Sequence, residues 1–541
     1  MQNKIENMRV TDMAGRLAKS FLYNPLTSML GVFLILVGYI ALVVTPREED
    51  PQIAISGGSI MVVLPGATPK EVENVILKPL ERRIKEINGV DNIMSIAAEN
   101  VAIINVMYKI GENREESNLK LYDKVMQNMD QLPKGVMQPL VKPFDIDIDI
   151  PIMTFSFYPK DESKIDQIEL FQKVKEIQHQ ISDVENVAKV ELKGERKEQY
   201  NIAVDLGKLS GYHLSLGQIT QALESLAVSM PSAKGRTNSK ELVVFGAKNA
   251  IESVEDVEEI IVAKYMNSII HLKDVATVTR GVDIQNFYGA QITYKENGEF
   301  VPLKEQITLS VSKLKGTNAV FIAEDVMKKI EEIKPQLEKD GIGVIVTRNF
   351  GERANEAVNE LVFHLEISIV IIALLLVFVL GWKESLIVTF TVPAILAITL
   401  FVAYLTGQTI NRITLFAFLL SLGLLVDAAI IVIENIHRHL HSHDAADKEL
   451  DEIVVEATDE IGAPTNVATI AIILTMVPMA FVGQMMGEFM KPIPYNVPVA
   501  LLASLVIAYI FTPFLAKKLL KKPKMHHHQH GLKNAHENGD K

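Results

Sequence analysis

Apolar residues in this chain gather in six long blocks. The first block, 26–45, has no charged residue, and its length is about enough for one helix to cross a hydrocarbon core roughly 30 Å thick. The other five lie near the carboxyl end, at about 363–381, 386–405, 414–434, 464–484 and 496–516. Residues 46–360, between the first block and the others, have an ordinary soluble composition. The pattern predicts one membrane span, a large polar domain and then a bundle of five spans.

Lys and Arg residues close to the spans predict the orientation of the chain. They gather before the first block (Lys4, Arg9, Arg16 and Lys19) and after the last one (Lys517, Lys518, Lys521, Lys522 and Lys524). Six spans return the chain to the side on which it started, so we expect both termini in the cytoplasm and the large domain outside. Block 26–45 is too long for a typical signal peptide and lacks a small-x-small cleavage site, so we expect an uncleaved anchor.

The polar domain contains an internal repeat. A strand pattern that ends in Pro occurs at 59–65 and again at 153–159, an offset of 94 residues. A second pair of similar segments, 87–93 and 181–187, has the same offset. Because two separate matches share one offset, we expect a duplicated structural unit.

Each unit is expected to contain a strand, a helix, two strands and a second helix. The predicted first helices are 68–87 and 164–181. The strands that follow are 90–97 and 101–109 in the first unit, with counterparts 184–192 and 199–204 in the second. This order is typical of the split β-α-β, ferredoxin-like arrangement. A final strand-helix-strand passage, 306–348, leads back to the membrane.

The predicted fold is a six-helix transmembrane bundle with a large extracytoplasmic α+β domain made of repeated ferredoxin-like units. The segments are a cytoplasmic amino terminus (1–25), the first span (26–45), the duplicated units (46–205), an inserted lobe (206–280), a return to the membrane (281–360), five further spans (363–516) and a His- and Lys-rich cytoplasmic tail (517–541).

The residue that carries most functional information is Asp427, inside block 414–434. A carboxylate at the centre of a span costs roughly 2.5–3.5 kcal/mol on insertion scales, so it is retained mostly where it is paired, protonated or in contact with water. Removal from water favours the protonated form of a carboxyl group, which suits it to bind and release protons. Glu434, two helical turns on, and Gly423, one turn back, share its face. We expect proton coupling; the alternative is a structural carboxylate against a neighbouring helix.

Two groups of histidines are weak candidates for metal ligands. One group follows the fourth span and the other lies in the tail: His437, His439, His441 and His443, then His526, His527, His528 and His530. Imidazoles at such spacings bind zinc, copper or nickel. A solvated loop and a low-complexity linker are the favoured interpretation, so no metal site is firmly predicted.

Composition mainly excludes other classes of protein. The 541 residues are 48% hydrophobic and 22% charged, include no Cys and carry a net charge of −12. The lack of Cys excludes thiolate metal sites and a thiol nucleophile, and the acidic balance argues against nucleic-acid binding. No phosphate-binding Gly loop with a Lys and no Ser/His/Asp arrangement is evident, so we expect neither an enzyme nor a cofactor. The alternating Asp and Ile residues at 145–150 are interpreted as a solvated strand face.

These features together resemble the amino-terminal half of a resistance–nodulation–division (RND) efflux permease. The resemblance extends over residues 20–520 and includes the span motif GLLVDAAIIVIEN at 423–435. Supporting segments are PREEDP at 46–51, LPGATPKEVE at 64–73, KPLE at 78–81, LKDVA at 272–276 and the passage from Met485 to Pro494.

The resemblance implies a proton antiporter in a bacterial inner membrane with its large domain in the periplasm. Asp427 would carry the proton, the duplicated units would form the porter, and the 206–280 lobe would be a docking or funnel portion. The family also implies a trimer that works with a periplasmic adaptor and an outer-membrane channel. The implied substrates are lipophilic or amphiphilic compounds.

Two departures from the family pattern leave alternatives open. Drug exporters of the family usually have a second Asp where this chain has Ala428, and Asp-Ala-Ala followed by Glu-Asn-x-His is similar to the heavy-metal branch. Full members also carry a second half, with a Lys that pairs with the Asp, and no span here has a central Lys or Arg. We therefore expect a carboxyl-terminal half from another chain or a missing part. Metal export and a non-transporting scaffold or truncated remnant are the alternatives.

Overall fold

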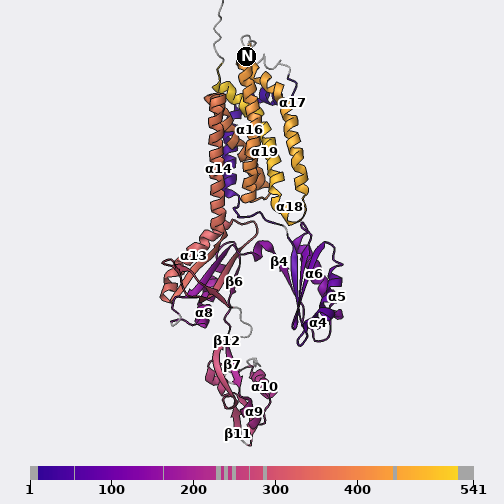
Figure 1. Cartoon of the computed structure of the whole chain (residues 1–541), viewed down its shortest axis with the longest axis vertical. Coiled ribbons are helices and arrows are strands. Elements are labelled where there is room, and N and C mark those ends of the chain that lie inside the picture. The colour runs from indigo at the N-terminus through magenta and orange to yellow at the C-terminus, as the bar shows by residue number, and fades with distance from the viewer. Residues whose placement is uncertain are drawn as a thin grey trace, which may run out of the picture.

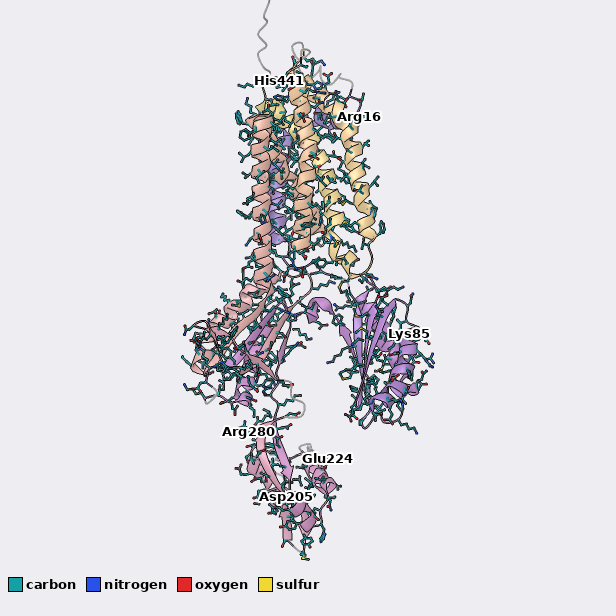
Figure 2. The ribbon with its side chains drawn as sticks, in the orientation of Figure 1. Arg16, Lys85, Asp205, Glu224, Arg280 and His441 are labelled. Carbon is teal, nitrogen blue, oxygen red and sulfur yellow. The ribbon has the colours of Figure 1, made fainter. Side chains whose placement is uncertain are left out.

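The computed structural model describes residues 10–53, 55–161, 164–226, 233–236, 242–245, 251–266, 268–283, 289–442 and 448–521. Figure 1 shows a long helical bundle with two α/β units beyond one end of it and a smaller lobe farther out. The amino terminus lies at the opposite end of the bundle, away from these units. Figure 2 shows Arg16 and His441 at that same end.

Among the residues that the structure describes, six helices are long and apolar enough to cross a membrane. They are α3 (Leu26–Val44), α14 (Phe350–Val379), α15 (Trp382–Leu405), α16 (Arg412–Leu440), α17 (Leu450–Met476) and α19 (Pro492–Leu519). A 3-10 turn (Val477–Phe481) extends α17, and the short helix α18 (Gln484–Met490) leads into α19. Each of the six predicted apolar blocks falls on one of these segments, so apolar helices of the expected length are present where the blocks predict them.

The centre of the bundle is built by α16 and α19. Val426 and Ala429 of α16 and Ala508 and Tyr509 of α19 are buried in one core, to which α14, α15 and α17 also contribute. Small residues allow close helix contacts elsewhere, and Gly38 of α3 lies directly against α15.

A short helix, α2 (Met13–Leu22), precedes the first span and packs against α17 and α19 at the end of the bundle far from the α/β units. Its buried face consists of Ala14, Gly15, Ala18 and Leu22. Asp459 of α17 fixes the start of this helix by accepting hydrogen bonds from the backbone N–H groups of Thr11 and Asp12, at 3.0 and 2.8 Å. The amino-terminal segment is therefore part of the bundle.

The first α/β unit is a four-stranded antiparallel sheet with helices on one face. Its strands are β1 (Gly57–Val63), β2 (Val90–Ala98), β3 (Val101–Tyr108) and β4 (Leu140–Phe144), in the order β2-β3-β1-β4. The helices are α4 (Pro69–Val72), which continues through a π turn (Glu73–Leu77) into α5 (Lys78–Ile84), and α6 (Arg114–Gln127). Ile60 and Val62 of β1 pack against Ile76, Leu80 and Leu121 of these helices.

The second unit repeats this strand order with residues from two distant parts of the chain. Its sheet contains β5 (Met153–Pro159), β6 (Val187–Lys193), β16 (Lys304–Lys313) and β17 (Ile342–Asn349), in the order β6-β16-β5-β17. Helices α8 (Gln167–Ser182) and α13 (Ala319–Lys339) cover one face. The short strand β13 (Ala290–Ile292) pairs with the start of β16.

The prediction that 199–204 is the counterpart of 101–109 is wrong. Strand β7 (Glu198–Val204) pairs with β12 (Ala276–Val282) outside the sheet, and β16, which pairs with β6 and β5, occupies the place that β3 has in the first unit. The prediction assumed that the strand next in sequence after β6 also pairs with it. The insertion separates β6 from its partner β16, and the pattern of one strand does not indicate which strand it pairs with.

The offset of 94 residues holds at the helix ends but not in the strands. Backbone N–H groups of Val90 and Val184 donate to the carbonyls of Ile87 and Ile181, which are equivalent at 94. In β1 and β5, however, this offset matches exposed Met61 with buried Phe155. Side chains of a strand point alternately to the two faces of its sheet. Equivalent positions of β1 and β5 are therefore an odd number of residues apart.

The inserted lobe is carried by the β7–β12 ribbon. The lobe contains four short helices: α9 (Leu206–Gly211), α10 (Leu216–Leu226), α11 (Val254–Glu258) and α12 (Leu272–Val275). It also contains two strand pairs: β8–β9 (Ala233–Arg236, Leu242–Phe245) and β10–β11 (Ile261–Tyr265, Ser268–His271). The hairpin β14–β15 (Lys295–Glu296, Glu299–Phe300) follows before β16.

The acidic run at 145–149 is not a strand. It forms one helical turn, α7 (Ile146–Asp149), in which the carboxylate of Asp149 accepts a hydrogen bond from the backbone N–H of Asp145 at 2.8 Å. Asp145 in turn pairs with Arg114. Short Asp side chains compete in this way with the hydrogen bonds of a strand, which explains the incorrect prediction.

The segment after α3 joins the bundle to the outer units. The carbonyl of Pro46 accepts a hydrogen bond from the Ile410 N–H (2.8 Å), and the Glu48 N–H donates to the Ile410 carbonyl (3.0 Å). The Ala319 N–H, at the start of α13, donates to the Arg47 carbonyl (3.0 Å). This segment thus contacts both the α15–α16 loop and the second α/β unit.

Candidate functional site

Helix α16 is well defined by its sequence. Asn411 caps it, because its side-chain oxygen accepts hydrogen bonds from the N–H groups of Ile413 and Thr414, both at 3.0 Å. Most of the following residues are apolar and helix-compatible, and no Pro interrupts them. The helix therefore runs without a break past Asp427 to Leu440.

One face of α16 points away from the rest of this chain. The exposed residues recur every three or four positions along one stripe, which we call the outward stripe: Phe416, Leu420, Gly423, Asp427, Ile431 and Glu434. The residues on the other sides of the helix are mostly buried in the bundle core. The predicted common face of Gly423, Asp427 and Glu434 is therefore present, and it is the uncovered face.

Asp427 lies near the middle of this 29-residue helix. Among the residues that the structure describes, none forms an ion pair or hydrogen bond with its carboxylate. The surrounding residues of the stripe are Gly and large apolar side chains. A carboxylate at this depth on an uncovered apolar face requires a partner or water to be stable within a membrane.

The two small residues predicted near Asp427 have different environments. Ala428 is buried in the bundle core, at 4% exposure, so it packs within this chain. A methyl group added at Gly423 would meet no atom within 4 Å. Among the described residues Gly423 therefore has no packing partner at its Cβ position, and its side of the helix is open.

The histidines at the end of α16 bind carboxylates and backbone groups. His437 Nδ1 lies 3.3 Å from Oε1 of Glu384 on α15, and His439 Nε2 lies 3.3 Å from Oε2 of Glu460 on α17. The ring of His441 lies 4.3 Å from that of His437. Within the described ranges, no cluster of three or more His, Asp or Glu side chains could hold a metal ion. His443, His526, His527, His528 and His530 lie outside the described residues.

Charged residues at the other end of α16 are not among those predicted from the sequence. Arg412 pairs with Asp50 and lies 3.9 Å from Glu49, both in the segment after α3. The run of charged residues at 47–50, directly after an uncharged span, is the sequence feature that could have indicated these pairs. These pairs connect the start of the Asp427 helix to the junction with the outer units.

Comparison with known proteins identifies the family to which this chain belongs. The sequence profile of the AcrB/AcrD/AcrF family matches residues 17–538. A curated relative is the swarming motility protein SwrC of Bacillus subtilis (strain 168), which is 25% identical over 517 residues that cover 88% of this chain and 47% of that protein. The chain thus spans about half the length of this relative. The family match includes all six spans and both α/β units, and so the chain belongs to the AcrB/AcrD/AcrF family of RND permeases.

Proposed function

We propose that this chain is the amino-terminal half of a proton-driven RND efflux permease for lipophilic or amphiphilic compounds. The observation that carries the proposal is the position of Asp427 in the middle of an apolar span, on the outward stripe of α16. A second half, which supplies a basic residue, would cover this stripe. Asp427 would then exchange a proton as that contact forms and breaks.

Glu434 has a secondary part in this proposal. It lies on the same stripe, two turns nearer the end of the helix that is expected to face the cytoplasm. A carboxylate at that position suits the entry or exit of protons at the membrane surface. Its loss would slow proton transfer without abolishing it.

The two outer units share one strand order, and each has helices on one face of its sheet. We infer that both are ferredoxin-like subdomains of the porter and that the lobe on the β7–β12 ribbon is the docking or funnel portion. In this proposal the bundle lies in a bacterial inner membrane and the outer units lie in the periplasm. Both termini of the chain lie in the cytoplasm. The assembly would be a trimer joined to a periplasmic adaptor and an outer-membrane channel.

The test is export by cells that produce this chain together with a carboxyl-terminal half of the family. Asp427→Asn keeps the size of the side chain and removes its proton exchange, so we expect dye and detergent export to fall to the level of cells without the chain. Glu434→Gln is the matched control on the same stripe and should retain part of the export. Membrane levels of each variant must equal those of the parent.

The same assay separates the alternatives. If Asp427→Asn exports dyes as well as the parent chain, the proton role of Asp427 is wrong. If the parent protects cells from copper, zinc or nickel but not from dyes and detergents, the substrate is a metal ion. If export is unchanged when the chain is removed and no second half copurifies, a scaffold or remnant explains the chain better.

A further inference from the structure

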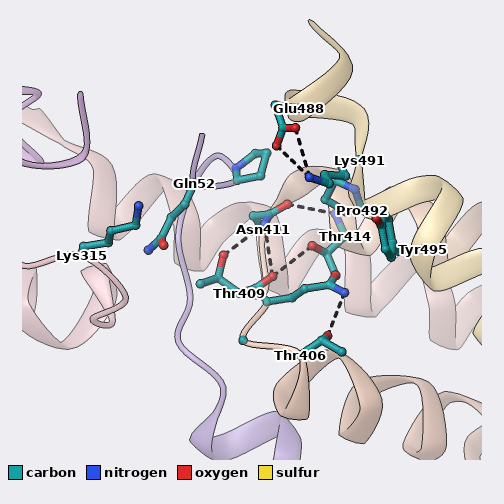
Figure 3. A pocket seen from close by; sticks show the side chains of 13 residues that line it. Gln52, Lys315, Thr406, Thr409, Asn411, Thr414, Glu488, Lys491, Pro492 and Tyr495 are labelled. Carbon is teal, nitrogen blue, oxygen red and sulfur yellow. Dashed lines mark hydrogen bonds and ion pairs between the residues drawn. The ribbon is translucent and has the colours of Figure 1, made fainter. Parts of the chain in front are cut away.

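The two ends of the bundle differ in the polar groups that they leave available to a ligand. Near the outer units, a cavity of about 400 Å³ lies between the α15–α16 loop and helices α18 and α19. Figure 3 shows polar groups of its lining bound to one another: Lys491 pairs with Glu488, and the Asn411 amide donates to the Thr409 carbonyl and hydroxyl. At the opposite end of the bundle, two histidines of α16 have a ring nitrogen that remains available.

The Nδ1 atoms of these two histidines are hydrogen-bond donors. His437 Nδ1 lies 3.3 Å from Oε1 of Glu384, at the start of α15, and His441 Nδ1 lies 2.9 Å from the carbonyl oxygen of His437. An ionised carboxylate and a carbonyl only accept hydrogen bonds, so each Nδ1 atom carries a hydrogen. In a neutral imidazole the other nitrogen is then unprotonated. Both Nε2 atoms therefore present a lone pair.

These two lone pairs are accessible. Among the described residues, none forms a hydrogen bond or an ion pair with the Nε2 atom of His437 or of His441. The His437 side chain is 35% exposed, and His441 is exposed. Figure 2 shows His441 at the end of the bundle far from the α/β units. A small solute can thus reach both rings.

The two rings are close enough to bind one ion together. Residues four positions apart on a helix lie on the same face in consecutive turns. The ring centres of His437 and His441 are accordingly 4.3 Å apart. Because a zinc–nitrogen bond measures about 2.0–2.1 Å, one ion can bind both rings.

The partners of the two Nδ1 atoms are of the kind found behind metal-bound histidines. Such a histidine almost always donates its other ring N–H to a carboxylate, a backbone carbonyl or water, which fixes the ring and makes the free nitrogen a better ligand. His437 has the carboxylate of Glu384, and His441 has a backbone carbonyl. The Glu384 side chain is only 13% exposed, so its negative charge is weakly screened and favours a cation nearby.

The neighbouring His439 lacks these properties. Its Nδ1 atom lies 3.0 Å from the Asn435 carbonyl oxygen, and its Nε2 atom lies 3.3 Å from Oε2 of Glu460 on α17. Both of its ring nitrogens therefore face acceptors, and neither presents a lone pair to a ligand. His439 is thus a matched control within the same turn of α16.

We propose that His437 and His441 bind one late first-row divalent cation, such as zinc, nickel or copper. Two protein ligands leave the other coordination positions to water, so the site is open and its ion is exchangeable. The bound ion strengthens the hydrogen bond from His437 to Glu384 and so fastens the end of α16 to α15. This role lies beyond the proposed export and does not depend on which compounds the protein exports.

The test is calorimetric titration of the purified full chain with Cu²⁺. The tail histidines would also bind copper, so the background chain carries Ala at all five of them: His526, His527, His528, His530 and His536. In this background, His437→Ala and His441→Ala should each bind Cu²⁺ about tenfold more weakly or worse, because a direct ligand matters at least as much as an outer partner. His439→Ala should bind like the background chain.

Electron paramagnetic resonance of the Cu²⁺-loaded chain provides a second readout. The background chain should show coupling to two imidazole nitrogens, and each single histidine variant should show coupling to one. Glu384 is a positioning residue, so Glu384→Ala should weaken binding by about tenfold and keep both nitrogens in the spectrum. Glu384→Gln keeps an acceptor for His437 and should weaken binding less.

Three outcomes would overturn the proposal. One is equal Cu²⁺ affinity of the background chain and the double variant His437→Ala/His441→Ala, with both having the same thermal stability. Another is a loss of affinity in His439→Ala as large as that in His437→Ala. The third is a spectrum of two imidazole nitrogens that survives the loss of His437. None of these results bears on the export assay of Asp427, so the two proposals fail separately.

Discussion

Glu48 and Lys313 form an ion pair whose side chains are only 5% and 8% exposed. It joins the segment after α3 to the end of β16 and therefore ties the bundle to the second α/β unit. Gln52 donates a further hydrogen bond to Glu48 Oε1 at 2.8 Å. The other oxygen, Oε2, is buried and accepts no hydrogen bond from the described residues.

Removal of Lys313 alone should be strongly destabilising. In Lys313→Met the Glu48 carboxylate stays buried without its counter-charge, which costs about 3–5 kcal/mol in comparable pairs. The measurement is thermal or denaturant unfolding of the purified chain in detergent. The double variant Glu48→Leu/Lys313→Met removes both charges and should recover most of the loss. A double variant as unstable as the single one would contradict this account.

The two glycines of the spans should respond oppositely to a large side chain. Gly38→Leu in α3 should disrupt the bundle, because even a Cβ at this position would overlap the backbone and side chain of Ala397. Gly423→Leu should leave the folding of this chain unchanged, because no atom of the described residues lies within 4 Å of its Cβ position.

Folding and association can be measured separately for these variants. Thermal stability of the chain alone reports folding, and copurification with a tagged carboxyl-terminal half reports association. We expect Gly38→Leu to lower the thermal stability of the chain. Gly423→Leu should keep the parent's thermal stability and lose only the copurification. If Gly423→Leu still associates normally, the outward stripe is not the interface.

Asp459 should hold α2 on the bundle. Asp459→Ala removes the acceptor of the Thr11 and Asp12 N–H groups and of the Thr11 hydroxyl, at 2.8–3.0 Å. We expect a local loss of about 1–3 kcal/mol. Amide hydrogen exchange should therefore become faster in α2 but not in α16. Glu456→Ala, on the same helix, is the control, since Glu456 pairs with Lys448 instead.

A pH effect is expected in the first α/β unit. Hydrogen bonds from Lys124 and Arg83 hold the pKa of the Glu86 carboxyl below its usual range. The stabilisation is therefore complete above the ordinary Glu pKa of about 4.3 and is lost as pH falls through the lower pKa of the folded state. Because Glu86 is solvent-exposed, the effect should be small.

The comparison of parent and Glu86→Gln tests this sign. The variant should exchange amide hydrogens in α5 and α6 slightly faster than the parent at pH 7. The difference should disappear in strongly acidic buffer, where both side chains are neutral. A difference that grows on acidification would mean that the ion pairs of Glu86 do not stabilise the unit.

The spans were predictable because uncharged runs of about twenty residues have few other stable environments. The first helix of the repeat was also predictable, since Val72, Leu80 and Ile84 have helical spacing and lie in the core of the first unit. The pairing of β16 with β5 and β6 was not predictable from local pattern, because it depends on contacts across an insertion.

The candidate site was predictable in one respect and not in another. Helical periodicity places Gly423, Asp427 and Glu434 on one face, as the structure has them. It does not indicate whether that face is covered. The answer depends on how α14, α15, α17 and α19 surround α16, which is a property of the whole bundle.

Helix α14 begins at Phe350, directly after β17, and Asn349 caps it by accepting a hydrogen bond from the Glu352 N–H at 3.0 Å. Its 30 residues contain no Pro, and at about 1.5 Å per residue they measure roughly 45 Å. A hydrocarbon core of about 30 Å encloses only part of this length. One end of this unbroken helix is attached to the sheet through β17, and the other end belongs to the bundle. A tilt of the second unit would therefore also tilt the part of α14 that lies in the bundle.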